Sequence, residues 1–582
     1  MEKPGSDDWT KNTNSQTPNK GLTLKQIFTE VYITKEESED VSEISQIQTA
    51  FREPFTPEEP IKYEDIFKPL SGEDQNKKIR TVMTKGVAGT GKTVSTQMFL
   101  QDWAEGRANQ DIDYVFPLSF RKLNTVKDKE FSLMELLRHF FCEVSRERIC
   151  NKETKTVFIL DGLDESRLPL SPKNSDCSDV TKRTSVDSLL TNLIDGTLLP
   201  SACLWITTRP AAANMIPSVD RMTELRGFTD PQKEQFFKKR FFDDENQAQT
   251  IWSHISKSQS LHIMCYLPIF CWIAATVLEK ILRMYKTVQC ALPKTLTAMY
   301  IHFIVVQFNH QNVKKDGDPR NMALNPMNIK AILSLGKLAF EQLKKGTLIF
   351  YEADLIECGM NTADASEYSG VFTTMFREES GLHEVPVFSF VHLSVQEFIA
   401  ALYVFLSFNN DGINLMSQET SKWSKLFKKP KKNLYQSAVA EALKSPNGHL
   451  DMFLRFLLGL SVKSNQTLLK LLFKQPANSS ETNDETVKYI KKKLRENISQ
   501  EKKMGLLHCL NELNDDSLEK EVQRYLTSGS ISKFSPAQWT TLNFMLLSSG
   551  RVLDVFDLKK YSASEGALLR LLPVVKASKR LL

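Results

Sequence analysis

Apolar residues recur along this chain with two different spacings, and the change from one to the other divides it into regions. From residue 80 to about residue 228, short apolar runs alternate with longer segments of helical spacing. The runs predict β-strands at residues 81–85, 114–119, 156–160, 203–207 and 222–225. Strands that alternate with helices form a parallel sheet covered by helices on both faces, so this region predicts an α/β domain.

Beyond residue 228 the apolar positions follow helical spacing almost throughout. We predict helices at residues 231–242, 247–256, 269–285 and 295–307. A mixed stretch follows, with strands expected at residues 347–351 and 387–391, and residues 394–582 are expected to form pairs of helices. The second part of the chain is therefore predicted to be mainly α-helical.

A glycine-rich loop joins the first predicted strand to a helix expected at residues 94–105. Its eight residues follow the pattern GxxxxGK[ST] and are Gly86, Val87, Ala88, Gly89, Thr90, Gly91, Lys92 and Thr93. Glycines allow such a loop to turn its backbone N–H groups towards phosphate, and the helix N-terminus adds a field that favours anions. Lys92 is then expected to reach the β- and γ-phosphates of a nucleotide, and Thr93 to bind Mg²⁺. The segment predicts a P-loop.

Carboxylates directly follow another predicted strand. Residues 157–165 read VFILDGLDE, an apolar run that leads into three acids. Asp161, at the end of the strand, is expected to hold Mg²⁺ directly or through water, and Asp164 or Glu165 to orient the attacking water as the catalytic residue. Alone, a loop with three acids is more often a solvated turn. Together with the upstream P-loop, it predicts a nucleotide site.

The strand expected at residues 203–207 leads into Arg209. An arginine at the carboxyl end of a sheet strand can contact the γ-phosphate, and the alternative is a structural ion pair. The chain has no NKxD segment of the kind that reads guanine. This favours ATP or ADP as the bound nucleotide.

Composition narrows the class of protein. A net charge of +5 over 582 residues does not predict nucleic acid as a partner. The nine cysteines form no CxxC pair, which fits a reducing compartment. Residues 1–20 are polar and lack a signal region, and the longest near-apolar run, at residues 267–278, is too short to span a bilayer. We therefore expect a cytoplasmic protein of several domains.

Three segments resemble the NACHT module of the NOD-like receptors, within the STAND class of P-loop ATPases. They are the loop GVAGTGKT at residues 86–93, the strand VFILDGLDE at residues 157–165 and the segment WITTRP at residues 205–210. The resemblance implies an α/β P-loop NTPase with a parallel sheet, followed by a helical domain, a winged helix and a second all-α helical domain. The expected divisions are 1–20 (disordered), 21–80 (resembling the FISNA segment of the large fish receptor set), 81–228 (NACHT), 229–290 (helical), 291–405 (winged helix) and 406–582 (second helical).

Two residues receive roles through the resemblance. Pro268, in the segment CYLP, resembles a proline that packs on adenine, although the residues alone also allow it to break a helix. His392, in the segment FVHLSVQEF, resembles a histidine that contacts the β-phosphate of ADP, although a histidine between apolar neighbours is more often a core residue. The resemblance thus implies a switch that ADP holds closed and ATP opens for self-oligomerisation through NACHT. Adaptors or sister receptors are the implied partners, and ATP hydrolysis is slow at most.

Two other classes of function remain open: a multiple-turnover P-loop enzyme such as a kinase, and a non-signalling regulator that binds sister receptors. The basic run between Lys422 and Lys432 has the charge to touch anionic lipid, but we expect a solvated loop there. The segment before residue 20 is too short and polar for a death-fold domain, and no leucine-rich repeat pattern occurs. The resemblance therefore does not extend to ligand sensing or effector recruitment.

Overall fold

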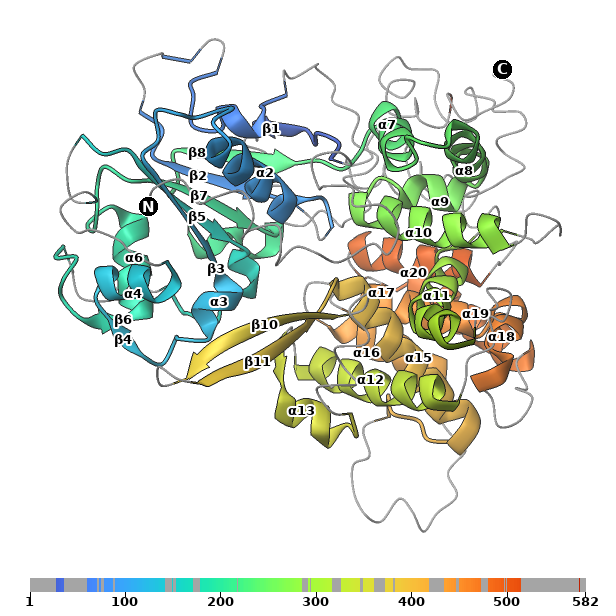
Figure 1. The fold of residues 1–582 in the computed structure, drawn as a ribbon. Helices are drawn as coiled ribbons and strands as arrows, with labels where there is room; N and C mark the ends of the chain where they lie inside the picture. The colour runs from blue at the N-terminus through green and yellow to red at the C-terminus, as the bar shows by residue number, and fades with distance from the viewer. Residues whose placement is uncertain are drawn as a thin grey trace. The chain divides into compact units, whose positions relative to one another are not determined.

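The chain forms two compact units in the computed structural model, one mainly of residues 53–240 and the other mainly of residues 241–582 (Figure 1). Residues 266–269 belong to the first unit. The structure describes residues 28–35, 60–70, 73–74, 78–86, 89–141, 149, 153–170, 178–216, 218–284, 292–293, 295–316, 326–345, 349–360, 372–379, 383–417, 434–445, 450–472, 480–496, 498, 500–513 and 575.

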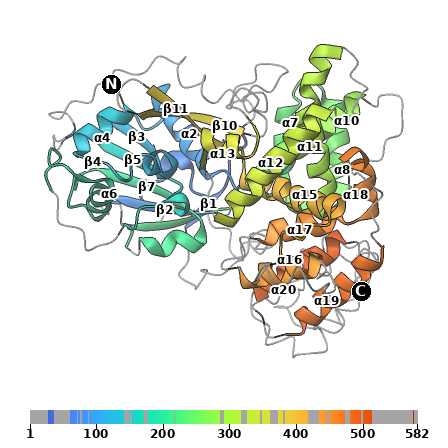
Figure 2. The ribbon, with the colours of Figure 1, turned by 90° about the horizontal axis from the view of Figure 1, so that it is seen from below.

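A six-stranded sheet forms the centre of the first unit. Its order is β1 (Ile33–Lys35), β8 (Arg221–Leu225), β2 (Thr81–Lys85), β7 (Cys203–Thr208), β5 (Thr156–Asp161) and β3 (Tyr114–Ser119). The labels of β2, β7, β5 and β3 in Figure 2 follow this order. All neighbouring strands are parallel except β1, which pairs with β8 in the antiparallel direction. The five strands predicted from the sequence are confirmed to within one residue at each end.

Helices cover both faces of this sheet, because successive side chains of a strand point to opposite faces. Leu204 and Ile206 of β7 pack in a core with residues of α4 and α6, whereas the Trp205 ring between them lies 5.6 Å from the Phe99 ring of α2. The helices of the first unit are α2 (Lys92–Ala104), α3 (Phe120–Asn124), α4 (Leu133–Phe140), α6 (Val186–Asp195) and α7 (Asp230–Arg240). A short ribbon of β4 (Glu130–Phe131) and β6 (Thr184–Ser185) and the 3₁₀ segments η2 (Tyr63–Asp65), η3 (Leu163–Glu165) and η4 (Pro210–Met215) complete it.

The segment before the P-loop strand is built into the same sheet, so the sheet is mostly rather than wholly parallel. Strand β1 pairs with the edge of β8, whose backbone groups need partners there. The buried Arg221 of β8 donates hydrogen bonds to the carbonyl oxygens of Ile66 and Lys68 and to the Glu73 carboxylate, at 2.9, 2.8 and 2.6 Å. These contacts attach Ile66, Lys68 and Glu73 to the sheet.

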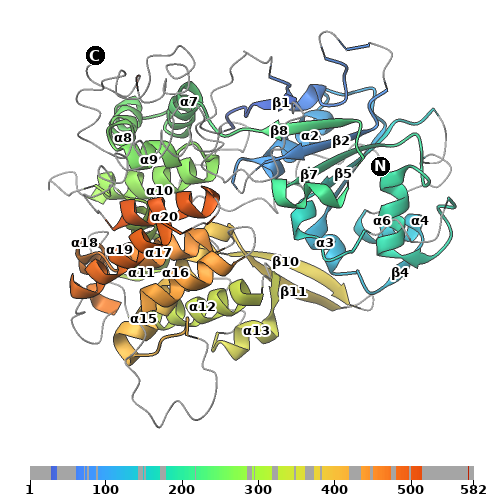
Figure 3. The ribbon, with the colours of Figure 1, turned by 180° about the vertical axis from the view of Figure 1, so that it is seen from behind.

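The second unit is mainly helical, as predicted. Its helices are α8 (Glu245–Lys257), α9 (Gln259–Met264), α10 (Pro268–Met284), α11 (Leu296–Asp316), α12 (Pro326–Lys345), α13 (Glu352–Glu357), α15 (Leu393–Asp411), α16 (Leu434–Lys444), α17 (Asp451–Leu460), α18 (Lys463–Leu468), α19 (Ser480–Leu494) and α20 (Gln500–Glu512), with the 3₁₀ segment η7 (Lys470–Leu472). The three-stranded antiparallel sheet consists of β9 (Ile349–Tyr351), β11 (His383–Phe390) and β10 (Phe372–Glu379). Figure 3 shows β10 and β11 as a long hairpin. The sequence predicted β9 and the end of β11, but not β10.

The core of the second unit contains a charged network. The Glu512 carboxylate of α20 accepts hydrogen bonds from the Thr297 hydroxyl at 2.8 Å and from Arg455 Nη2 at 2.8 Å. The Arg455 and Glu512 side chains are only 3% and 1% exposed. Gly459 lets α17 approach α11 closely, since a Cβ there would lie 2.0 Å from the Thr297 hydroxyl oxygen. The network ties α11, α17 and α20 together.

Candidate functional site

The predicted P-loop leads from β2 directly into α2. Gly91 caps the helix with φ +104°, a left-handed conformation that glycine adopts without strain. A Cβ on Gly86 would lie 2.8 Å from the Thr90 hydroxyl oxygen, so a side chain there would collide with the loop. Val87 and Ala88 lie outside the described residues. The described part of the loop has the tight turn that phosphate binding requires.

Lys92, the first residue of α2, turns back over the loop. Its Nζ donates a hydrogen bond to the Gly86 carbonyl oxygen at 2.6 Å. Burial lowers the pKa of Lys92 to about 8, although the nearby Asp164 carboxylate opposes this shift. A buried ammonium group is stabilised by a bound anion, so this environment fits the phosphate contact predicted for Lys92.

The sheet order brings the other predicted phosphate-site residues next to this lysine. Strand β7 lies between the P-loop strand β2 and the acidic strand β5, and Leu160 pairs with Ile206. The Asp161 carboxylate therefore lies at the same edge as Thr207, and it accepts hydrogen bonds from the hydroxyls of Thr93, at 2.8 Å, and Thr207, at 2.6 Å. Thr207 Oγ1 also accepts the Gly162 backbone N–H at 3.0 Å.

These side chains fit a magnesium ion. The Thr93 hydroxyl and the Asp161 carboxylate supply adjacent oxygen donors, which Mg²⁺ prefers, and this ion takes its remaining ligands from phosphates and water. In the part of the chain that the structure describes, no three His, Cys, Asp or Glu residues are grouped to hold a metal by themselves. A magnesium ion here would therefore depend on nucleotide phosphates.

Both candidate catalytic carboxylates form ion pairs. Arg209 Nε lies 2.7 Å from Asp164 Oδ2. The Arg121 guanidinium binds both carboxylate oxygens of Glu165, at 2.5 and 2.7 Å, and the Asn124 side chain donates to the Glu165 carbonyl oxygen at 2.8 Å. The sequence allowed two interpretations of Arg209, a contact to the γ-phosphate or a structural ion pair, and the structure contains the ion pair.

Residues 28–31 lie between the P-loop and α7. Val31 Cγ1 would be 3.8 Å from a Cβ on Gly91, and the carbonyl oxygens of Phe28 and Glu30 accept hydrogen bonds from α7 side chains at 2.7 and 2.6 Å. Thr29 between them is 3% exposed, and its buried hydroxyl has no hydrogen-bond partner among the described residues. An unsatisfied buried hydroxyl calls for an explanation, and a bound polar group is one such explanation.

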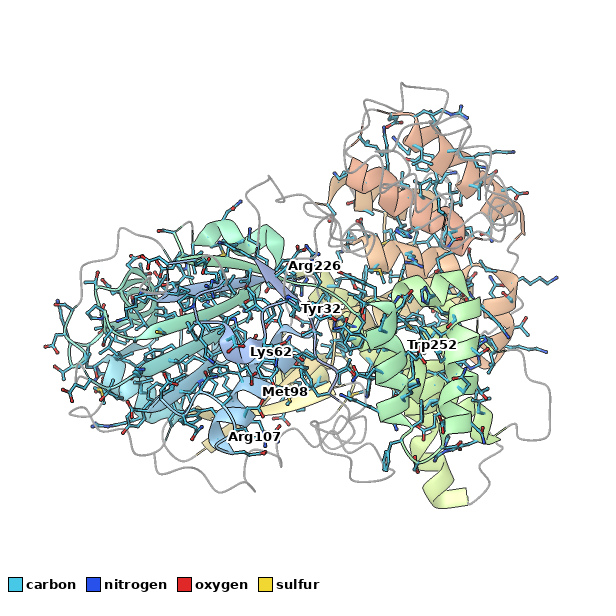
Figure 4. All side chains as sticks on the ribbon, turned by 90° about the horizontal axis from the view of Figure 1, so that it is seen from above. Tyr32, Lys62, Met98, Arg107, Arg226 and Trp252 are labelled. Atoms are coloured by element: carbon cyan, nitrogen blue, oxygen red, sulfur yellow. The ribbon has the colours of Figure 1, made fainter. Side chains whose placement is uncertain are left out.

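The chain continues from here into β1. Just before this strand, the Tyr32 carbonyl oxygen accepts the backbone N–H of Arg226, the residue after β8, at 2.9 Å; both residues are labelled in Figure 4. Figure 4 also labels Lys62, the residue just before η2, Met98 in α2 and Arg107 in the turn after α2. Trp252, labelled as well, lies in α8. The Tyr63 hydroxyl of η2 donates to Asp102 of α2 at 2.5 Å. The N-terminal segment therefore contacts the P-loop helix as well as the sheet.

Pro268 is the first residue of α10, a position that proline favours because its missing N–H would have no helical partner. The next residue, Ile269, donates its backbone N–H to the Gly89 carbonyl oxygen at 3.4 Å. Both residues belong to the first unit, so the structure brings Pro268 to the P-loop.

His392 belongs to the second unit and caps the N-terminus of α15. Its Nδ1 accepts the Ser394 backbone N–H at 3.1 Å and lies 2.6 Å from the Ser394 hydroxyl oxygen. The role of His392 at a phosphate remains a prediction, as do those of the other site residues. The basic run between Lys422 and Lys432 lies outside the described residues.

Reasoning from the sequence missed three residues of the site: Thr207, Arg121 and Thr29. Thr207 is the last but one residue of β7, and Arg121 lies in α3, two residues after β3 ends. Both strands neighbour β5, which carries Asp161, so strand order would have revealed them. Thr29 had no such pattern, because residues 28–35 form only a three-residue strand with little apolar periodicity.

Four family models match the chain in succession. They are "Fish-specific NACHT associated domain" at residues 11–68, "NACHT domain" at residues 80–245, "NOD2 winged helix domain" at residues 330–390 and "NLRC4 helical domain HD2" at residues 392–521.

Curated relatives cover most of this chain. Protein NLRC3 of Mus musculus is 31% identical over 81% of this chain and 44% of its own length. NACHT, LRR and PYD domains-containing protein 3 of Homo sapiens is 27% identical over 92% of this chain and 49% of its own length. A solved STAND protein with a tetratricopeptide repeat sensor from Pyrococcus horikoshii is 13% identical, with 86% of this chain and 74% of that one covered, at a TM-score of 0.24. The chain spans about half the length of the curated relatives it matches.

The parallel sheet, the P-loop and the acidic strand end define a P-loop NTPase of the NACHT type. The winged-helix and helical matches follow it in the second unit. The chain belongs to the NOD-like receptors, in the group that carries a FISNA segment before NACHT. No helix within the described residues has the length and apolar character needed to cross a membrane.

Proposed function

We propose that this chain is a nucleotide-dependent switch of innate immune signalling, held closed by ADP and opened by ATP into an oligomer. The observation that carries the proposal is the meeting of Lys92, Thr93 and Asp161 at one edge of the sheet. Family membership supports the signalling role. Self-association through the NACHT domain, and adaptors or sister receptors as partners, are part of the same proposal.

The phosphates are bound by residues of the P-loop. Lys92 exchanges its hydrogen bond to the Gly86 carbonyl oxygen for contacts with the β- and γ-phosphates, and the N-terminus of α2 favours their charge. Thr93 and Asp161 would hold Mg²⁺, which neutralises phosphate charge when bound. Thr207 keeps the Asp161 carboxylate turned towards Thr93 through its hydrogen bond.

The base is bound by the N-terminal segment and the start of α10. We place adenine against the Pro268 ring and within reach of the buried Thr29 hydroxyl, which has hydrogen-bonding capacity that no described residue uses. A hydroxyl both donates and accepts, so it matches an adenine edge that carries both kinds of group. The N-terminal segment is then part of the nucleotide site.

Hydrolysis, in this proposal, is a slow timer. The Asp164 and Glu165 carboxylates are engaged by Arg209 and Arg121, so neither accepts a proton from water before its arginine moves. A fast enzyme, such as the kinase alternative, needs a base already placed for the reaction.

Replacement of Lys92 by Ala tests the site. We expect at least a hundredfold loss of affinity for ADP and ATP, because the buried cation that meets the phosphates is gone. The matched control is Lys155→Ala, an exposed lysine of the same unit paired with Asp111, which should bind normally. Unchanged binding by the Lys92 variant would contradict the proposal, and steady phosphoryl transfer to a small molecule would favour the kinase alternative.

Replacement of His392 by Ala tests the latch. A contact made with ADP but lost with ATP shifts the population between closed and open states. The variant should release ADP faster and form oligomers at lower ATP, as measured by light scattering. His254→Ala, which removes a half-buried histidine bound to the Pro293 carbonyl oxygen, is the control. A variant that stays monomeric and keeps ADP as tightly as the parent would refute the latch.

A further inference from the structure

Residues 162–167, which we call the acidic turn, fold back on the end of β5. Gly162 begins the turn with φ +83°, a left-handed conformation that favours glycine. The Glu165 backbone N–H donates to the Gly162 carbonyl oxygen at 2.9 Å, and Glu165 Oε2 would lie 3.5 Å from a Cβ on Gly162. The Glu165 carboxylate therefore lies close to the residue that follows Asp161, the predicted magnesium ligand.

Helix α3 holds the acidic turn with two side chains, Arg121 and Asn124. They are three residues apart and so lie on the same face of the helix. Arg121 binds both carboxylate oxygens of Glu165. The Asn124 Nδ2 donates to the Glu165 carbonyl oxygen at 2.8 Å, and its Oδ1 accepts the Arg167 backbone N–H at 2.9 Å. The two side chains together hold the carboxylate and the backbone of the turn.

The orientation of the Asn124 amide follows from its partners. A carbonyl oxygen can only accept and a backbone N–H can only donate, so Nδ2 faces Glu165 and Oδ1 faces Arg167. An ionised Asp at this position would have no proton for the Glu165 carbonyl oxygen, and a Leu would bind neither group. An amide side chain therefore matches both backbone partners.

The start of α3 is fixed to the same edge of the sheet as the acidic turn. Ser119, the last residue of β3, caps the helix and pairs with Asp161 of β5. Phe120 and Leu123 of α3 are both 0% exposed, so the helix is anchored in the core. Packing therefore sets the place of α3, and the Asn124 side chain fixes the backbone of the acidic turn to it.

We infer that Asn124 is a positioning residue that keeps Glu165 bound to Arg121, so that α3 restrains ATP hydrolysis. The inference rests on the proposed function. As the general base, Glu165 takes the proton that the attacking water loses while its oxygen bonds to the γ-phosphorus and the bond to ADP breaks. A carboxylate whose two oxygens bind a guanidinium accepts that proton poorly. Hydrolysis therefore requires the acidic turn to leave α3.

This restraint acts on hydrolysis and leaves nucleotide binding alone. Within the described residues the Asn124 side chain bonds to Glu165 and Arg167, whereas the phosphate and magnesium contacts are predicted for the P-loop and Asp161. A change at Asn124 should therefore alter the rate of hydrolysis and not the affinity for nucleotide. General damage to the site would weaken both, so the two measurements distinguish a positioning role from a merely structural one.

Replacement of Asn124 by Ala in the full chain tests the restraint. With the protein in excess over ATP, a single round of hydrolysis is measured and product release does not limit its rate. We expect hydrolysis to become about tenfold faster, because a general base contributes about 100- to 10,000-fold and the freed turn releases Glu165 for part of the time. The affinity for ADP should stay the same. An unchanged or slower rate would overturn the inference.

The matched control is Thr125→Ala, which removes another side-chain hydrogen bond at the end of α3, the one to the Lys122 carbonyl oxygen. This variant should hydrolyse ATP at the parent's rate. A double replacement then tests the role of Glu165. In the Glu165→Gln background, Asn124→Ala should have no further effect, because the amide accepts no proton from water. Equal acceleration in both backgrounds, or by both Asn124→Ala and Thr125→Ala, would overturn the inference.

Hydrogen exchange, followed by mass spectrometry on the nucleotide-free chain, tests the hold on the acidic turn by itself. Loss of the bond to the Arg167 N–H should speed exchange in peptides that cover residues 162–167 in Asn124→Ala but not in Thr125→Ala. Unchanged protection of β5 shows that the fold is intact. Equal protection of the turn in parent and Asn124→Ala would overturn the inference. A parent that binds no adenine nucleotide would instead contradict the proposed function, and exchange would still decide whether Asn124 holds the turn.

Discussion

Two sets of ion pairs, one in each unit, differ in their exposure to water. At the phosphate end of the first unit, Arg121 and Glu165 are 31% and 16% exposed, and Arg209 and Asp164 are 27% and 14% exposed. In the second unit, Arg455 and Glu512 are 3% and 1% exposed and share their bonds with Thr297. Water reaches the ion pairs at the phosphate end, which we call the open set. The Arg455–Glu512 pair, which we call the closed set, is shielded from water.

Exposure decides what each set can do. When one member of a partly exposed ion pair is replaced or moves away, the protein loses little free energy of unfolding, because water solvates the charge that remains. A buried charge without its partner is costly. We therefore expect the arginines near the P-loop to be able to exchange carboxylates for phosphates, whereas Arg455 and Glu512 hold three helices together.

Replacement of Arg455 by Met should have the largest effect and tests the closed set. Glu512 would be left buried without its cation, so we expect the free energy of unfolding to fall by about 3–5 kcal/mol. Chemical denaturation, monitored by a probe in the second unit, measures it. The double variant Arg455→Met/Glu512→Leu should recover most of the loss. A loss below about 1 kcal/mol in the single variant would break the comparison.

The pH dependence of ADP binding should be the next largest effect and tests the open set. Lys92 has a pKa of about 8 in the free protein, and bound phosphates keep it protonated. Below pH 8 the proton is already present, so the affinity is constant. Above pH 8 binding must take up a proton, and the affinity falls by up to about tenfold per pH unit. Titration calorimetry from pH 7 to pH 9.5 measures this.

The control for that profile is Lys92→Arg. A guanidinium keeps its charge over this range, so the variant's affinity should not fall above pH 8, whatever its absolute value. A parent whose affinity stays constant to pH 9.5 would show that Lys92 does not meet the phosphates as a titrating group.

Replacement of Arg121 by Gln should lower the free energy of unfolding by less than the Arg455 replacement does. The side chain is partly exposed, and its partner Glu165 can be solvated after the change. We expect the free energy of unfolding to fall by about 1 kcal/mol, a third or less of the Arg455 effect. Thermal unfolding of the two variants side by side gives the ratio. Equal losses would mean that the pair at the phosphate end stabilises the fold as much as the buried pair of the helical core.

Replacement of Lys444 by Ala should give the smallest change in unfolding free energy of these variants. Lys444 pairs with Glu441, which lies three residues earlier on the same helix α16, and the lysine side chain is 70% exposed. We expect a change in unfolding free energy of about 0.2–0.5 kcal/mol, which salt should remove. A larger change would show that exposure alone does not rank these pairs.

Much of the fold was predictable because it follows from local patterns. The five main strands of the first unit are short apolar runs between helices, and the P-loop is a contiguous motif, so both could be located without knowledge of contacts. Helix α17 is predictable for the same reason, since it is apolar over nearly all its length. Strand β10 was missed because its residues, FTTMFREE, include charged and polar side chains that do not resemble a buried strand.

The rest depended on contacts between distant segments. Strand β1 is three residues long and exists only because β8 offers an unpaired edge. The proximity of Asp161 and Thr93 follows from the insertion of β7 between their strands, which strand order decides.

The residues themselves were enough to establish a P-loop with an acidic strand end and to point to adenine nucleotides and a NOD-like receptor, because these depend on contiguous residues whose backbone geometry is local. The burial of the Arg455 pair, the Arg121 partner of Glu165 and the bond between Asn124 and Arg167 emerged only from the tertiary structure. Each joins groups 43 to 57 residues apart, and such a contact is decided by how helices and strands pack, since packing sets both the distance and the access of water.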